Sequence, residues 1–211
     1  MHYRDKWEEI VQMVLNDKNS RHFINVLDKA KEKYQAEVIR RESELVDIEN
    51  WNIRESYPFN ETYIKEDRKK SILQPFYAQY RSELEKAFVD FLEESEAVEW
   101  WFKNGDRDAT FFAIPYDSGE KKPFYVDFIV KLKDGRIALL DPHGVHLSDF
   151  KAKSDGLLRY LRDENKKGKK LFGGILTNTD PRKYNGRWVY FDKPSRELKD
   201  NNFDNWADLE L

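Results

Sequence analysis

Apolar side chains recur every three to four residues in the N-terminal part of the chain, which is the spacing that predicts helices. This pattern covers residues 5–15 and 20–47, and the polar turn between them predicts an N-terminal helical hairpin. After a connector without clear periodicity, the pattern returns over residues 78–94 and predicts a third helix. Glu85 lies next to the apolar stripe of this helix.

Beyond residue 97, short runs rich in aromatic and β-branched residues predict strands. The runs cover residues 98–102, 110–116, 124–130, 136–140, 171–177 and 187–191. An Asp134-Gly135 turn joins two of them and predicts a β-hairpin, and a helix over 147–164 follows it. A strand, helix, strand passage after a hairpin predicts a mixed β-sheet flanked by helices, an α/β (α+β) fold.

Three regions follow from this reading. Residues 1–77 form a helical N-terminal region and connector, residues 78–193 form the domain that contains the sheet, and residues 194–211 form a polar tail with Trp206 as an anchor. A chain of 211 residues is long enough to bury a full core of this kind.

Composition restricts the possible classes of protein. The apolar fraction of 39%, with aromatic residues at 15%, indicates a globular chain and not a disordered one. No apolar run is long enough for a membrane span and the N-terminus does not resemble a signal peptide, so we expect a cytoplasmic protein without membrane contact. The absence of cysteine excludes disulfides, thiolate zinc sites and a cysteine nucleophile.

Charge alone does not predict a nucleic-acid partner, because the net charge is −3 and DNA-binding proteins are usually basic. A local basic segment, residues 159–170, runs against this average, and it is a candidate for phosphate contacts together with Lys103. A solvated helix end is the alternative explanation for the same residues.

Two aspartates stand in apolar surroundings on the strands of the predicted hairpin. Asp127 lies within the run 124–130, and Asp141 follows the apolar run that ends at Leu140. A buried carboxylate is costly unless something pairs with it, and two on adjacent strands suggest a shared divalent cation. Alternation along a strand places Asp141 and His143 on one side, and Pro142 offers its carbonyl. The same residues also fit a simple strand end, with His143 packed in the turn.

Several segments resemble one nuclease family. They are Ser71–Tyr77, Glu85 with Phe88 and Leu92, Trp100–Asn104, Phe124–Phe128, Asp141–Gly144, and Asp149 with Lys153. Over residues 57–191 the chain is similar to the C-terminal endonuclease domain of type III restriction-type helicase-nucleases, a branch of the PD-(D/E)XK nuclease superfamily. The resemblance implies a restriction-endonuclease-like sheet.

The resemblance also implies roles for individual residues. Asp127 and Asp141 become ligands of Mg²⁺ (or Mn²⁺), Glu85 supports the metal, and Lys153 lies at the rim of the active site. The carbonyl of Pro142, placed there by strand geometry, is a further candidate ligand of the metal. Two positions differ from the family pattern. Val126 stands in place of a proline, and His143 stands in place of the motif lysine.

The replacement at His143 leaves three readings open. Histidine can substitute for the lysine, a basic residue such as Lys153 can take over its role, or the site has lost activity. His143 together with His146 also offers a weaker alternative, a transition-metal pair.

The expected function is therefore that of a Mg²⁺-dependent endonuclease domain that hydrolyses DNA as part of a restriction or defence helicase-nuclease. A helicase or ATPase region or subunit is an expected partner, and a homodimer is a possible assembly. The sequence contains no phosphate-binding loop of the ATPase type. The alternatives are a catalytically inactive nuclease-like module that binds nucleic acid or a partner protein, and an assembly module built on the helical hairpin.

Overall fold

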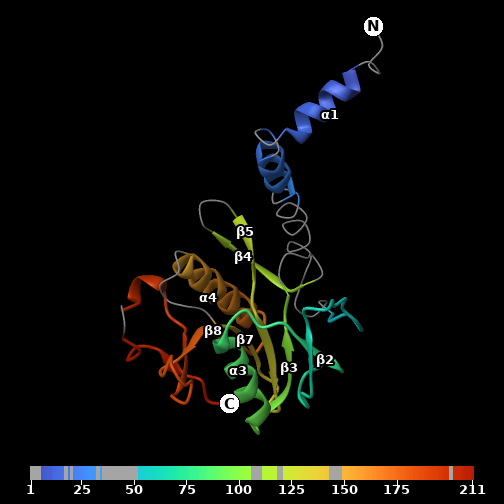
Figure 1. Ribbon diagram of the computed structural model, residues 1–211. Helices are drawn as coiled ribbons and strands as arrows, with labels where there is room; N and C mark the ends of the chain where they lie inside the picture. Colours follow the sequence, from blue (N-terminus) through green and yellow to red (C-terminus); the bar gives the residue numbers. More distant parts are fainter. Residues whose placement is uncertain are drawn as a thin grey trace.

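The computed structural model describes residues 6–16, 19, 21–31, 34, 52–105, 111–117, 121–142, 149–199 and 202–211 (Figure 1). Within these residues the main sheet has six strands in the order β10-β9-β8-β7-β6-β3. The strands are β3 (Val98–Lys103), β6 (Phe128–Leu132), β7 (Ile137–Pro142), β8 (Leu171–Asn178), β9 (Trp188–Phe191) and β10 (Ala207–Asp208). β7 and β8 pair in parallel and the other neighbours pair antiparallel. The prediction of a mixed α/β sheet is confirmed.

The β6–β7 hairpin is formed as the Asp-Gly turn predicts. Gly135 has a φ of 92°, a left-handed conformation that favours glycine, and its N–H donates to the carbonyl of Leu132. In the antiparallel register Phe128 lies opposite Leu140, so Asp127 comes next to Asp141 one position further along.

Two helices cover opposite faces of the sheet (Figure 1). Helix α3 (Glu83–Glu94) begins at Ser82, whose hydroxyl accepts from the N–H of Glu85, and it buries Phe88 and Leu92 against Trp101 and Phe128.

Helix α4 (Phe150–Lys166) connects the parallel strands β7 and β8, and it packs on the other face. Phe150, Leu157 and Leu161 are buried there with Leu139 and Ile175. Alternate residues of the central strands therefore fill two separate cores.

The structure also contains two small two-stranded sheets that the sequence patterns did not predict. β1 (Ile64–Glu66) pairs with β2 (Phe76–Ala78), so the predicted helix over 78–94 starts five residues later than expected. β4 (Ala113–Asp117) pairs with β5 (Lys121–Tyr125).

The predicted single strand over 124–130 is also wrong, because the chain changes partner within it. Tyr125 pairs with Ala113 in the small sheet, whereas Phe128 pairs with Lys103 in the main sheet. Asp127 lies at the point of exchange between the two sheets.

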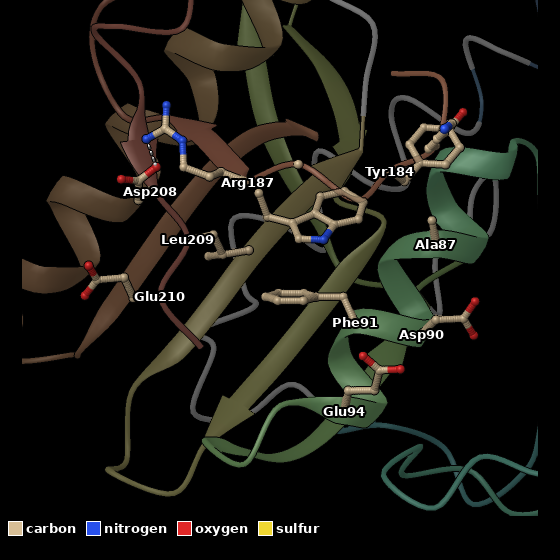
Figure 2. Close-up of a pocket in the computed structure, with 12 residues that line it drawn as sticks. Ala87, Asp90, Phe91, Glu94, Tyr184, Arg187, Asp208, Leu209 and Glu210 are labelled. Carbon is tan, nitrogen blue, oxygen red and sulfur yellow. Dashed lines mark hydrogen bonds and ion pairs between the residues drawn. The ribbon is translucent and has the colours of Figure 1, made fainter. Parts of the chain in front are cut away.

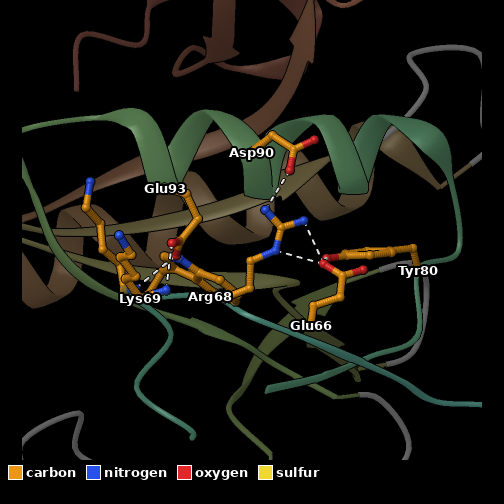
Figure 3. A network of polar contacts seen from close by, with 8 residues as sticks. Glu66, Arg68, Lys69, Tyr80, Asp90 and Glu93 are labelled. Carbon is orange, nitrogen blue, oxygen red and sulfur yellow. Dashed lines mark hydrogen bonds and ion pairs between the residues drawn. The ribbon is translucent and has the colours of Figure 1, made fainter. Parts of the chain in front are cut away.

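A polar network fastens the segment around β1 and β2 to α3 (Figure 3). The Arg68 guanidinium contacts Glu66 and Asp90, each at 2.6 Å in its ion pair. The hydroxyl of Tyr80 donates to the same Glu66 carboxylate at 2.9 Å, and burial together with this hydrogen bond raises the pKa of Tyr80. Glu93 accepts from the backbone N–H of Lys69, so the connector is held on the helix by side chains of both signs.

The N-terminal region contains α1 (Trp7–Leu15) and a second helical stretch at residues 21–31. Trp7 is 60% exposed and Leu27 is 67% exposed, so these apolar side chains are not buried between the two helices of the predicted hairpin. Most of the second predicted helix beyond residue 34 lies outside the described residues.

The C-terminal segment joins the edge of the main sheet. Trp206 is buried as the predicted anchor, next to Phe150 and Phe191, and β10 pairs with β9. A short 3-10 helix, η2 (Ser195–Glu197), is held by Asp155, which accepts from the backbone N–H and the hydroxyl of Ser195. In the described part of the chain, no helix has the length and apolar character needed to cross a membrane.

Candidate functional site

Asp127 and Asp141 lie side by side near the end of β7. At Asp127 the chain passes from the small β4–β5 sheet into the main sheet. The backbone N–H of Asp127 donates to Oδ1 of Asp141 at 3.3 Å. Asp141 is 3% exposed, and Asp127 is partly buried. The structure therefore places side by side the two aspartates that the predicted hairpin put on adjacent strands.

The electrostatics of this pair are unfavourable for two negative charges. Burial raises the pKa of Asp127 to about 6, against the opposing ammonium of Lys103 and with a further rise from Glu85. Burial and the neighbouring Asp127 carboxylate raise the pKa of Asp141 well above its ordinary value, and Lys153 opposes this shift. A pair of this kind is stabilised by additional positive charge.

Glu85 and Lys103 form the second part of the site. The ammonium of Lys103 lies 2.8 Å from Oε2 of Glu85, and both side chains are almost fully buried. Lys103 is the last residue of β3 and pairs with Phe128, directly after Asp127, which explains why its charge acts on the aspartate. The backbone N–H of Arg81 also donates to Glu85, at 3.3 Å.

Lys103 is not among the catalytic or metal-binding residues that the sequence predicts. The apolar run over residues 98–102 predicts a strand that stops one residue before it, and its charge makes it only a candidate for phosphate contacts. Only the register between β3 and β6 reveals that this lysine lies beside Glu85 and Asp127.

Lys153 lies near the start of α4 and its charge acts on both aspartates. Its ammonium contacts Asp149 at 2.8 Å and lies 5.3 Å from the centre of the Phe124 ring. Its charge opposes the rise in pKa of both aspartates, so it contributes positive potential to the centre. We use the name acidic centre for Glu85, Asp127 and Asp141 with the cations Lys103 and Lys153.

Asn104 holds the backbone around Asp127. Its amide donates to the carbonyls of Phe112 at 2.7 Å and Val126 at 2.9 Å, and its oxygen accepts from the N–H of Phe112. The backbone N–H of Asn104 donates to the carbonyl of Asp127 at 2.8 Å. This 4% exposed amide thereby fixes the point where the chain leaves one sheet for the other.

Other predicted residues are placed differently. Pro142 is buried at the end of β7. His143 and His146 lie outside the described residues, so their predicted roles stay predictions.

The basic segment 159–170 is remote from the acidic centre for most of its length. Lys153 and Lys166 are separated by 13 residues of one helix, or about 20 Å at 1.5 Å per residue. The backbone carbonyl of Lys170 accepts a hydrogen bond from the N–H of Ile137, at the start of β7. Asp141 lies near the opposite end of the same strand. Lys166 and Lys167 also pair with Asp163 and Glu164 on their own helix.

Two carboxylates suit a small hard cation such as Mg²⁺, which commonly takes one or two protein carboxylates and keeps several waters. The raised pKa values of Asp127 and Asp141 agree with this, because a divalent cation would relieve their repulsion. No cluster of three or more His, Cys, Asp or Glu side chains suited to a metal is found within the described ranges, and Glu85 is engaged by Lys103. A cation at this place would therefore have Asp127 and Asp141 as its carboxylate ligands.

A separate cavity of about 600 Å³ lies between α3 and the C-terminal segment around β9 and β10 (Figure 2). Four carboxylates line it, together with two cations that include Arg187, which is paired with Asp208 at 2.7 Å. The carboxylates are those of Asp90, Glu94, Asp208 and Glu210. The acidic lining makes this cavity unsuitable for a polyanion.

The fold and the acidic centre define the class of the protein: a mixed α/β domain that holds a buried carboxylate pair at the junction of two sheets. The chain belongs to the YagJ family, whose model matches residues 68–179. The matched region contains all five residues of the acidic centre. Searches of curated proteins and of solved structures found no match.

Proposed function

We propose that this protein is a Mg²⁺-dependent endonuclease that hydrolyses phosphodiester bonds of DNA. The observation that carries the proposal is the hydrogen bond from the backbone N–H of Asp127 to the buried carboxylate of Asp141, which brings together two aspartates with raised pKa values and two lysines beside them. Such a centre combines a place for a divalent cation with fixed positive charge for a phosphate.

Each residue of the acidic centre has a distinct role in this proposal. Asp127 and Asp141 would hold the cation, with the carbonyl of Pro142 as a further donor. When bound, Mg²⁺ supplies Lewis-acid stabilisation of charge on the phosphoryl oxygens and lowers the pKa of a bound water. Glu85 keeps Lys103 oriented, and through water it would support the cation.

Lys103 and Lys153 supply the positive charge that the motif lysine would otherwise provide. Lys103 is close to Asp127, and Lys153 acts on both aspartates. A fixed ammonium near the attacked phosphate stabilises the charge that develops on its oxygens. His143 would orient or deprotonate the attacking water.

The wider setting is part of the same proposal. The resemblance to helicase-nucleases supports a helicase or ATPase region or subunit as partner, DNA as substrate and a cytoplasmic defence system as context. Phosphate contacts that do not read bases would make the affinity sensitive to salt. A homodimer is the assembly that would cut both strands.

The test is cleavage of a supercoiled plasmid with Mg²⁺ or Mn²⁺ by the wild-type chain, Asp141→Asn and Glu164→Gln. Glu164 is a matched control, because it is a buried acid paired with Lys167 near the remote end of α4. We expect metal-dependent nicking by the wild type and by Glu164→Gln, and at least a hundredfold lower rate for Asp141→Asn, which loses a ligand of the cation. Cleavage that survives Asp141→Asn contradicts the proposed site.

The ion pair between Glu85 and Lys103 favours a second candidate, a catalytically inactive module that binds nucleic acid or a partner protein. In this arrangement an ammonium already neutralises one of the three acids. This candidate predicts that Mn²⁺ leaves the midpoint of thermal unfolding unchanged and that DNA is bound without being cut. A rise of the midpoint that is lost in Asp141→Asn supports the nuclease.

A further inference from the structure

A second cavity, of about 400 Å³, opens beside the acidic centre on the side of β2. Its walls come from the connector at residues 55–63, from residues 73–81 and from the end of β3. Its volume falls within the range of small-molecule sites, and it is far too small for a double helix. A single base or nucleotide is of suitable size.

Aromatic rings form a large part of the lining. They are those of Tyr57, Phe59, Tyr63, Phe76, Tyr77, Phe102 and Phe111. The rings of Phe59 and Tyr77 stack at 3.9 Å between centroids with 14° between planes, and those of Tyr57 and Phe111 stack at 5.0 Å and 12°. Phe59 is 55% exposed, so this large apolar ring remains accessible from solvent. Rings arranged in this way form a platform on which a flat heterocycle can stack.

The cavity adjoins the acidic centre, because residues of its lining contact residues of that centre. Arg81 and Lys103 line the cavity, and both also contact Glu85. Asn104 lines the cavity as well, and its backbone is hydrogen-bonded to Asp127. A phosphate at the aspartates would therefore lie near the aromatic walls, where its neighbouring base could stack, and Lys103 belongs to both places.

Polar groups in the lining fit the edges of a base. The side chains of Gln79 and Glu55 border the cavity and can exchange hydrogen bonds with ring nitrogens and exocyclic groups. The other cavity, between α3 and the C-terminal segment, has an acidic lining instead. A polyanion is therefore expected at the aromatic cavity and not at the acidic one.

We propose that this aromatic cavity binds an unpaired nucleobase of the strand whose phosphate lies at the acidic centre. The preferred substrate is then a nucleic acid with a single-stranded or extruded nucleotide, and not a fully paired duplex. The inference rests on the proposed function, since the nuclease site sets where the strand lies.

The test measures fluorescence anisotropy of a short labelled oligothymidylate with the full chain in EDTA. The proteins are the wild type, Phe59→Ala, Tyr63→Ala, Phe59→Trp and Tyr184→Ala. Tyr184 is the matched control, because it is a half-buried aromatic residue of the other cavity. We expect Phe59→Ala and Tyr63→Ala to weaken binding about tenfold, Phe59→Trp to retain it and Tyr184→Ala to leave it unchanged. A paired duplex of equal length should bind less tightly than the single strand.

Oligothymidylate binding that is equal in the wild type and in a correctly folded Phe59→Ala and Tyr63→Ala overturns the inference. Circular dichroism checks the fold. Plasmid cleavage with Mn²⁺ separates this failure from that of the proposed function. Metal-dependent cleavage without a contribution from the aromatic residues to binding would rule out only the proposed base site. Binding that depends on Phe59 and Tyr63 without any cleavage would rule out only the nuclease activity, and the protein would then be a module that binds single strands.

Discussion

Asp127 is a residue whose ionised form is disfavoured by the fold. Its pKa of about 6 in the folded state lies above the ordinary value of 3.8. The folded chain therefore binds more protons than the unfolded chain between these two values, so this residue lowers the free energy of unfolding as the pH rises through 6. Below pH 4 both states hold the proton and the effect vanishes.

Asp127→Asn should therefore stabilise the metal-free protein at pH 7.5, by about 2 kcal/mol. The gain should shrink as the pH falls through 6 and disappear near pH 4. Thermal and urea unfolding in EDTA across this range measure it. A variant that is less stable than the wild type at pH 7.5 would show that Asp127 is stabilised by its surroundings in the charged form. Mn²⁺ should stabilise the wild type and not the variant.

Lys103 neutralises the buried carboxylate of Glu85. Removing one partner of such a pair leaves an uncompensated buried charge, which costs about 3 kcal/mol. Lys103→Met should therefore destabilise the protein by about this amount at pH 7.5. The double variant Glu85→Gln with Lys103→Met should recover most of the loss, because no charge is then left alone. A double-mutant cycle in urea measures the coupling, and additive effects would contradict it.

Asn104 acts at the scale of the elements, because it joins the end of β3 to Phe112, the residue before β4, and to Val126, the residue before Asp127. Asn104→Ala leaves buried backbone groups without these bonds and should cost about 2 to 3 kcal/mol. It should also reduce the stabilisation by Mn²⁺, since Asp127 is no longer held in place.

Asn178 provides the control for this prediction. It is 1% exposed and its amide holds Tyr184 and Gly186 in the loop before β9. Asn178→Ala should cost a similar amount of stability while the response to Mn²⁺ stays as in the wild type. Equal losses of the Mn²⁺ response in both variants would mean that it reports general stability and not the position of Asp127.

At the scale of the whole molecule, the two ends of the chain contribute unequally to the core. Among the described residues of the N-terminal helices, large apolar side chains such as Trp7, Met13 and Leu27 are exposed, whereas Trp206 is a member of a buried cluster. A chain that lacks residues 1–31 should therefore unfold at the same temperature as the full chain. Trp206→Ala should lower the free energy of unfolding by about 3 kcal/mol, because it removes a large buried ring. Calorimetry of the shortened chain and of Trp206→Ala, each beside the full chain, measures both effects. A lower midpoint of unfolding for the shortened chain would contradict the prediction.

Local patterns determined a large part of this fold. Alternation along the strands and the Asp134-Gly135 turn set the register of the β6–β7 hairpin, so the proximity of Asp127 and Asp141 was predictable from neighbouring residues alone. The crossover through α4 to a parallel strand followed from the order of the elements. These features depend on short-range geometry, which the sequence of a segment specifies.

Only the tertiary structure decided what surrounds that aspartate pair. The exchange of partners at Asp127, the pairing of Lys103 with Glu85 and the aromatic cavity join segments that are distant along the chain. No local periodicity encodes them, because they arise from the register of β3 against β6 and from the packing of α3 on the sheet. The sequence by itself therefore predicted where two buried carboxylates meet, and the packing of distant elements determined which cations and which rings lie beside them.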